Sequence, residues 1–163
     1  MEINTDFNEL YKTNSNAVYK LCLGYTGDTA LAHDLLQETF ITVWNNLNKF
    51  RGDSNWNTWI YRITVNTCLS YLRKKKEITY DISNPIFSNL PEEINYKEQE
   101  ISLLYKSISC LQETDRLIIM LVLEDKPYEE ISEIIGISAN NLRVKIHRIK
   151  KQLTDIYNNY ERL

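Results

Sequence analysis

The sequence predicts an all-α protein: two small helical domains joined by an acidic flexible linker, the second domain a helix-turn-helix. Only 4 glycines and 3 prolines occur in 163 residues, too few for a many-turned β fold. Apolar residues recur at three- and four-residue steps along most of the chain. Residues 77–96 break this pattern with two prolines and an excess of acids. We therefore expect one domain over residues 1–76 and another over residues 97–163.

Three helices are expected in the first domain. Apolar side chains form a stripe over residues 6–25. Gly24 and Gly27 are expected to break the helix at its end. A second stripe, which includes Trp44, covers residues 29–48. After a turn at residues 52–53, a third helix begins at Trp56 with Ser54 or Asn55 as its N-cap.

The second domain ends in a pattern typical of a DNA reader. Its first helices are expected over residues 97–111 and 114–123. Pro127 suits the first turn of a short helix, Gly136 its left-handed end, and Ser138 the N-cap of a long basic helix. A short helix, a glycine turn and a basic helix predict a helix-turn-helix. A helical hairpin with a solvated basic face is the alternative.

Charge is unevenly distributed in the chain. The net charge of −3 argues against nucleic acid. Residues 49–76, however, hold seven Lys or Arg and one Asp, a net +6, and residues 138–163 hold six against two acids, a net +4. In residues 50–76, aromatic and amide side chains alternate with these cations, which suits single-stranded nucleic acid because bases stack and phosphates are negative. An amphipathic helix with core tryptophans and lysines at its C-terminal end is the alternative.

Several classes of protein are disfavoured. No apolar run approaches the length of a membrane span, and the N-terminus is not a secretory signal. Cys22, Cys68 and Cys110 have no metal-ligand spacing, which favours a reducing cytoplasm and buried thiols. A helical enzyme has thin support, because no catalytic constellation accompanies His33 or His147. We expect no catalytic residue, metal or cofactor.

Two motif groups resemble a known family. The first is DLLQETF at residues 34–40, followed by FRGDS at 50–54 and TWIYRI at 58–63; the second begins with YEEISEIIGIS at 128–138. Together they resemble bacterial sigma factors of the extracytoplasmic-function (ECF) type. The resemblance implies a transcription initiation factor that binds core RNA polymerase at its β′ clamp and β flap, recognises promoter DNA and promotes strand opening. It also implies a membrane-bound anti-sigma partner, without membrane insertion of this chain.

The resemblance also implies three sets of site residues. Core polymerase would be contacted by Asp34, Leu35, Gln37, Glu38 and Phe40. The minus-ten element would be bound by Phe50, Arg51, Ser54, Trp56, Trp59, Arg62, Asn66, Arg73 and Lys74, with a flipped base held by the loop and Asn66. The minus-thirty-five element would be bound by Ser138, Asn140, Asn141, Arg143, Lys145, His147, Arg148 and Lys150. Extruding a base costs a few kcal/mol and stacking returns about 1–3 kcal/mol, so no ATP is needed.

The sequence departs from the family at some positions. Pro127 stands where a small polar residue is usual and Gln112 where proline is common, while Asn140 and Asn141 replace a small-residue or Thr pair. These two amides could read adenine edges.

Other interpretations remain open. A helix-turn-helix regulator that does not recruit polymerase would treat residues 34–40 as core, and an antagonist would only sequester a partner. In the free protein, the acidic linker could mask the basic blocks through Glu92, Glu93, Glu98 and Glu100.

Overall fold

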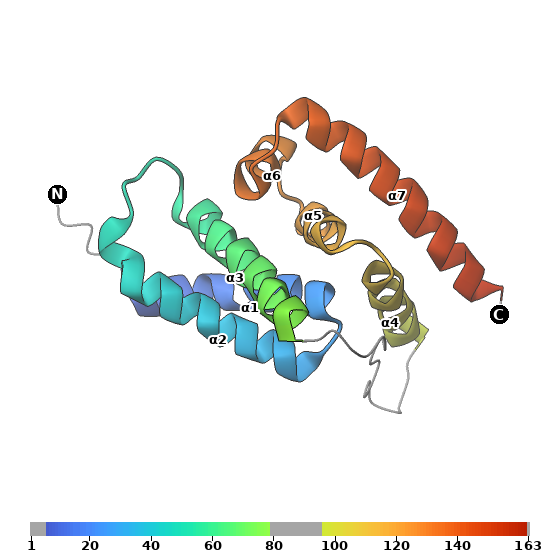
Figure 1. The fold of residues 1–163 in the computed structure, drawn as a ribbon, viewed down its shortest axis with the longest axis horizontal. Helices are drawn as coiled ribbons and strands as arrows, with labels where there is room; N and C mark the ends of the chain where they lie inside the picture. Colours follow the sequence, from blue (N-terminus) through green and yellow to red (C-terminus); the bar gives the residue numbers. More distant parts are fainter. Residues whose placement is uncertain (1–5, 79–95, 163) are drawn as a thin grey trace.

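The protein is built from α-helices and short connections (Figure 1). The computed structural model describes residues 6–78 and 96–162. Over these residues the all-α prediction is confirmed, with three long helices in the first part of the chain and four helices in the second. Most of the expected linker, including Glu92 and Glu93, lies outside the described residues.

The first domain consists of α1 (Phe7–Thr26), α2 (Thr29–Asn46), a 3₁₀ turn (Leu47–Lys49) and α3 (Trp56–Ile78). Side-chain caps set where the helices begin. The carboxylates of Asp6 and Asp28 accept from the backbone N–H groups of Asn8 and Leu31, both at 2.9 Å. The Asn55 side chain accepts from the Thr58 N–H at 2.8 Å, so Asn55 rather than Ser54 caps α3.

The second domain consists of α4 (Tyr96–Ser109), α5 (Glu113–Leu123), α6 (Tyr128–Ile135) and α7 (Ala139–Glu161). Gly136 ends α6 with φ 82°, a conformation that favours glycine. The Ser138 side chain then accepts from the Asn141 N–H at 3.3 Å and caps α7. Pro127 is the N-cap of α6, with φ −58° and ψ 146°, and therefore precedes the first turn in which the sequence predicts it. The predicted helix-turn-helix, α6 followed by α7, is confirmed.

Gly24 corrects the prediction for the end of the first helix. The helix continues through Gly24 to Thr26 and ends at Gly27, which has φ 67°. A Cβ atom on Gly24 would collide with the Met120 side chain of α5. Glycine therefore allows α1 and α5 to approach closely, and this contact joins the two domains.

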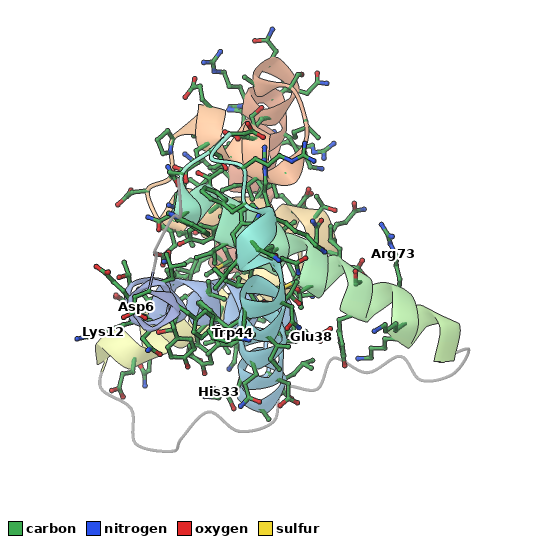
Figure 2. All side chains as sticks on the ribbon, turned by 90° about the vertical axis from the view of Figure 1, so that its left-hand side faces the viewer. Asp6, Lys12, His33, Glu38, Trp44 and Arg73 are labelled. Carbon is green, nitrogen blue, oxygen red and sulfur yellow. The ribbon has the colours of Figure 1, made fainter. Side chains whose placement is uncertain are left out.

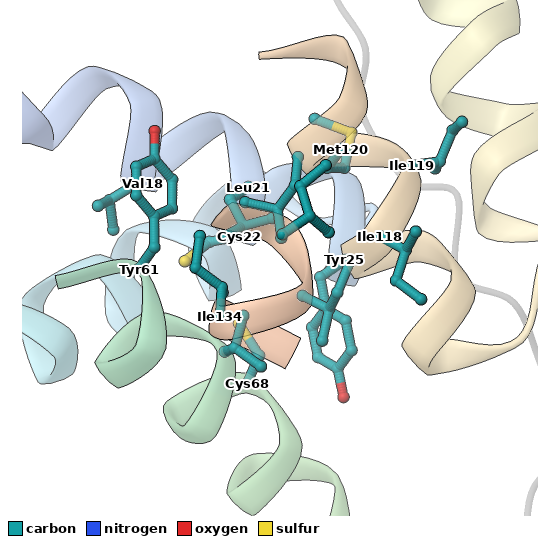
Figure 3. Packing of buried hydrophobic residues seen from close by; sticks show 14 of the residues in the cluster. Val18, Leu21, Cys22, Tyr25, Tyr61, Cys68, Ile118, Ile119, Met120 and Ile134 are labelled. Carbon is teal, nitrogen blue, oxygen red and sulfur yellow. The ribbon is translucent and has the colours of Figure 1, made fainter. Parts of the chain in front are cut away.

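The two domains share one continuous hydrophobic core (Figure 3). It contains side chains from α1, α3, α5 and α6, among them Val18, Leu21, Tyr61, Ile118 and Ile134. Polar contacts add to this interface: Arg116 donates to the Tyr25 carbonyl at 3.1 Å, and Lys20 lies 3.5 Å from Glu124. In this structure the domains are packed against each other.

Within the described segments, no helix combines the length and apolarity that crossing a membrane requires.

Candidate functional site

The outer face of α2 carries acidic and amide side chains. Asp34, Gln37 and Glu38 are exposed. Leu35 and Phe40 are only 1% and 3% exposed, because they pack into the core. The structure therefore corrects the expectation that these two side chains contact a partner directly.

Exposed apolar side chains do lie on α2, at other positions. Ile41 and Trp44 are each 60% exposed, although Trp44 was expected in the inward stripe (Figure 2). The Trp44 ring packs on Phe7 with ring centroids 5.0 Å apart, and Phe40 packs on Tyr11 at 4.7 Å. Ile41 follows Asp34, Gln37 and Glu38 at helical spacing, a signal from which its exposure could have been predicted.

The loop between α2 and α3 brings three aromatic rings together. Phe50 and Trp56 stack with centroids 3.7 Å apart, and Trp59 meets both edge-on at 5.4 and 5.5 Å. All three side chains are half-buried, as is Ser54, while Arg51 is exposed. Because Phe50 and Trp56 touch, a base would stack on an outer ring face or displace one ring.

Farther along α3, predicted residues differ in their surroundings. Asn66, Arg73 and Lys74 are exposed, and Arg73 projects from the helix (Figure 2). Arg62 is engaged by α6: its guanidinium donates to the Glu133 carboxylate at 2.9 Å and to the Glu133 carbonyl at 3.1 Å.

A second contact lies beside this pair. The Thr58 hydroxyl donates to the Glu130 carboxylate at 3.0 Å, and Lys126 lies 3.2 Å from the same carboxylate. Lys126 also sits over the Tyr61 ring, 4.5 Å from its centroid. Burial, with Glu124 and Glu130 nearby, raises the pKa of Tyr61 to about 12. The N-terminal half of α3 is thus covered by the short helix of the helix-turn-helix.

On α7, the predicted residues are mostly presented to solvent. Those exposed are Ser138, Asn140, Asn141, Arg143, His147, Arg148 and Lys150. Arg143 also lies 3.3 Å from Glu129 of α6. Lys145 differs, because its side chain is only 26% exposed and its ammonium lies 2.6 Å from the buried Asp115 carboxylate.

Sequence reasoning missed Val144 on the same surface. Its side chain is 73% exposed in a shallow hollow that Asn141, Lys145 and Arg148 also line. These residues follow one another at three- and four-residue steps and therefore share one face of α7. The sequence did contain a signal for this residue, because Val144 is an apolar residue among the basic residues of this helix.

Cysteine burial is as expected for two of the three residues. Cys22 and Cys68 are buried in the core, and a hydrogen bond with Cys22 together with burial raises the pKa of the Cys68 thiol. Cys110 is instead exposed, and its sulfur lies 3.6 Å from the Tyr160 hydroxyl. Among the described residues, no group of three or more His, Cys, Asp or Glu side chains could hold a metal ion.

Comparisons with known proteins agree with this arrangement. The Sigma-70 region 2 family matches residues 10–78, and the Sigma-70, region 4 family matches residues 101–153. ECF RNA polymerase sigma factor SigM of Bacillus subtilis is 30% identical over 154 residues, covering 92% of this chain and 94% of SigM. ECF RNA polymerase sigma-E factor of Escherichia coli K12 is 31% identical over 134 residues, covering 74% of this chain and 70% of that protein.

Solved structures show the same fold. The sigma factor RpoE of Bartonella quintana, crystallised with the anti-sigma factor NepR, superposes with a TM-score of 0.81 at 21% identity, over 94% of this chain and 97% of RpoE. CnrH, in complex with the cytosolic domain of CnrY, gives a TM-score of 0.69 at 16% identity, over 94% and 88% of the chains. Because both family regions occur in order and a relative aligns over nearly the whole length, this chain belongs to the ECF sigma factors of RNA polymerase.

Proposed function

We propose that this sigma factor binds core RNA polymerase through α2 and promoter DNA through α3 and α7. The minus-ten element meets the aromatic loop and α3, and the minus-thirty-five element meets α7. The observation that carries the proposal is the distribution of surface chemistry. An acidic and apolar face lies on α2, an aromatic cluster lies in the loop before α3, and exposed amides and cations lie on α7.

The polymerase-binding surface consists of Asp34, Gln37, Glu38, Ile41 and Trp44. Exposed carboxylates favour a basic partner, and the two apolar side chains add area that would be desolvated on binding. Large aromatic side chains such as Trp44 often contribute most of the binding energy of an interface. The partner proposed for this surface is the β′ clamp, while the second domain contacts the β flap.

Strand opening would use the aromatic loop. Phe50, Trp56 and Trp59 offer ring faces for an extruded base, and Asn66 offers an amide on the same helix. Arg51, Arg73 and Lys74 are exposed and would contact phosphates. Stacking offsets part of the cost of unpairing, so the factor would act by binding and without catalysis.

Duplex recognition would use α7 in the major groove. Asn140 and Asn141 lie in its first turn, where a recognition helix meets base edges, and amide side chains can pair with adenine. The exposed cations on the following turns would contact the backbone or guanine.

An anti-sigma factor is the proposed regulator. The similarly folded RpoE was determined in complex with the anti-sigma factor NepR, and CnrH in complex with the cytosolic domain of CnrY. The cytoplasm, where polymerase is found, is the proposed location.

A transcription assay with purified core polymerase and a pool of promoter fragments tests the function. Wild type should start specific transcripts, whereas Gln37→Ala/Glu38→Ala should fail to bind core and to start them. The matched control, Gln152→Ala/Asp155→Ala, removes an exposed amide and carboxylate from α7 and should bind core normally. If wild type binds DNA but neither associates with core nor starts transcription, a polymerase-independent regulator replaces this proposal.

A further inference from the structure

A buried carboxylate lies beneath the recognition helix. Asp115 belongs to the first turn of α5 and is only 2% exposed. Its position near the helix N-terminus favours the negative charge. A buried carboxylate nevertheless needs a counter-charge, because removing it from water is costly.

Two cations of α7 supply that counter-charge. Lys145 Nζ lies 2.6 Å from Asp115 Oδ1, and an Arg148 guanidinium nitrogen lies 3.9 Å from Oδ2. The two cations differ in exposure: the Lys145 side chain is 26% exposed and the Arg148 side chain 66%. Lys145 is therefore drawn toward the inside of the domain, whereas most of Arg148 faces solvent.

We propose that Asp115 is a positioning residue that holds Lys145 away from DNA and makes it an internal strut between α5 and α7. Arg148, steadied at one nitrogen by the same carboxylate, is presented to the DNA. This inference rests on the proposed function of α7 as the reader of duplex DNA. It separates two cations that the sequence alone places in one set.

Movement of the Lys145 side chain away from Asp115 would cost free energy. Turning the ammonium toward a phosphate would remove the near ion pair of Asp115 and leave only the Arg148 contact at 3.9 Å. Breaking a buried pair by removing one partner is strongly destabilising, and one phosphate contact, worth on the order of tenfold in affinity at low salt, returns less than that. Lys145 should therefore stay with Asp115 when DNA binds.

The salt dependence of DNA binding shows whether Lys145 stays paired with Asp115 or contacts a DNA phosphate. Each phosphate that a protein cation neutralises adds close to one to the slope of log affinity against log salt. The assay uses the full chain and a fluorescent duplex of random sequence, titrated over a range of salt concentrations. Lys145→Met should leave the slope at the wild-type value, and Lys150→Met, at an exposed position, should reduce its magnitude by about one.

Asp115→Asn provides the reverse test. Releasing Lys145 should increase the magnitude of the slope by about one and strengthen random-sequence binding at low salt on the order of tenfold. Asp155→Asn removes a charge from the exposed surface of α7 without releasing a lysine and should change neither quantity. If Lys145→Met does not fold, Asp115→Asn/Lys145→Met leaves no unpaired carboxylate, and it should also keep the wild-type slope.

Each other outcome has a definite meaning. If Lys145→Met lowers the slope as much as Lys150→Met, Lys145 contacts phosphate; the inference is then wrong, while α7 remains the DNA reader. If Asp115→Asn folds and leaves the slope and affinity unchanged, Asp115 does not hold Lys145 back. If Lys150→Met has no effect, α7 is not the DNA-binding element, and both the inference and that part of the proposed function are wrong.

Discussion

Val144 is an exposed apolar residue among polar residues on the recognition helix. It is a 73% exposed apolar residue with an amide and two cations around it in the same hollow. Single exposed apolar residues are common on protein surfaces. On a recognition helix, however, such a side chain can contact the methyl group of thymine in the major groove.

We expect Val144→Ala to fold normally and to bind a selected minus-thirty-five duplex about 4- to 15-fold more weakly, because the change removes two carbon atoms and about 0.8 kcal/mol is lost for each one that is buried against DNA. The duplex would come from a randomised pool selected with wild-type protein. Replacing one thymine at a time by deoxyuridine should reproduce the loss at a single position. At that position Val144→Ala should no longer distinguish the two bases; equal losses at every thymine would contradict a specific contact.

Tyr61 predicts how stability responds to alkaline pH. Burial, with two nearby carboxylates, raises its pKa to about 12, above the usual 10. The unfolded chain therefore releases this proton more readily, and the stabilisation is present below pH 10 and lost between about pH 10 and 12. A shift of this size corresponds to on the order of 3 kcal/mol.

Urea unfolding across this pH range tests the effect. Tyr61→Phe keeps the ring under Lys126 and removes the ionisable hydroxyl. It should show a smaller loss of stability between pH 10 and 12 than wild type. Tyr71→Phe is the control for removing a hydroxyl from α3, and it should lose stability as wild type does. An unchanged profile for Tyr61→Phe would assign the alkaline loss to other groups.

Among the helices, the packing of α1 on α5 depends on one missing side chain. A Cβ on Gly24 collides with Met120, so Gly24→Ala should lower the free energy of unfolding by about 1–3 kcal/mol through overpacking. Met120→Ala makes a cavity but also creates space for the new methyl group. The double variant should therefore be less destabilised than the sum of the single changes, measured by urea unfolding. Strict additivity would mean that these two positions do not compete for space.

Gly24 also shows what sequence could and could not predict. The helices were predicted well because periodicity, caps and turn glycines act over a few residues, as at Gly136 and Ser138. The role of Gly24 could not be predicted, because it depends on Met120, far away in the sequence. The local sequence pattern predicted a helix break at Gly24, whereas the glycine is needed for the close approach of α1 and α5.

In the functional surfaces, too, local sequence pattern predicts some features, and others depend on contacts between distant residues. Exposure of the polar residues on α2 and α7 follows from helical spacing. The partial burial of Lys145 and the exposure of Trp44 do not, since they depend on Asp115 and on the aromatic packing around Phe7. Family motifs place the chemistry on the correct helices, and only tertiary contacts decide which side chains a partner can reach.

At the scale of the whole molecule, the packing of the two domains covers part of the α3 surface. Arg62 and Thr58 are bound by Glu133 and Glu130 of α6. One hypothesis from the sequence is that the acidic linker could mask the basic blocks, and most of this linker lies outside the described residues. The carboxylates that the structure places against Arg62 belong to the helix-turn-helix instead.

The ion pair between Arg62 and Glu133 contributes little free energy to the packing of the domains. The Arg62 and Glu133 side chains are 37% and 42% exposed, and exposed ion pairs contribute about 0–1 kcal/mol. Docking must therefore depend mainly on the shared apolar core, with Met120 and Ile134 among its members. The carboxylates compete with phosphate for Arg62 but do not hold the domains together by themselves.

We therefore expect Glu130→Gln/Glu133→Gln to bind a single-stranded DNA oligonucleotide up to about fivefold more tightly in the free protein at low salt, the equivalent of about 1 kcal/mol. X-ray scattering should still show a compact particle, because the apolar interface is intact. The control, Asp125→Asn/Asp155→Asn, removes the same charge from two exposed positions whose carboxylates do not pair with Arg62. An equal gain in the control would assign the effect to net charge, and an expanded particle would show that the ion pairs, rather than the core, keep the domains docked.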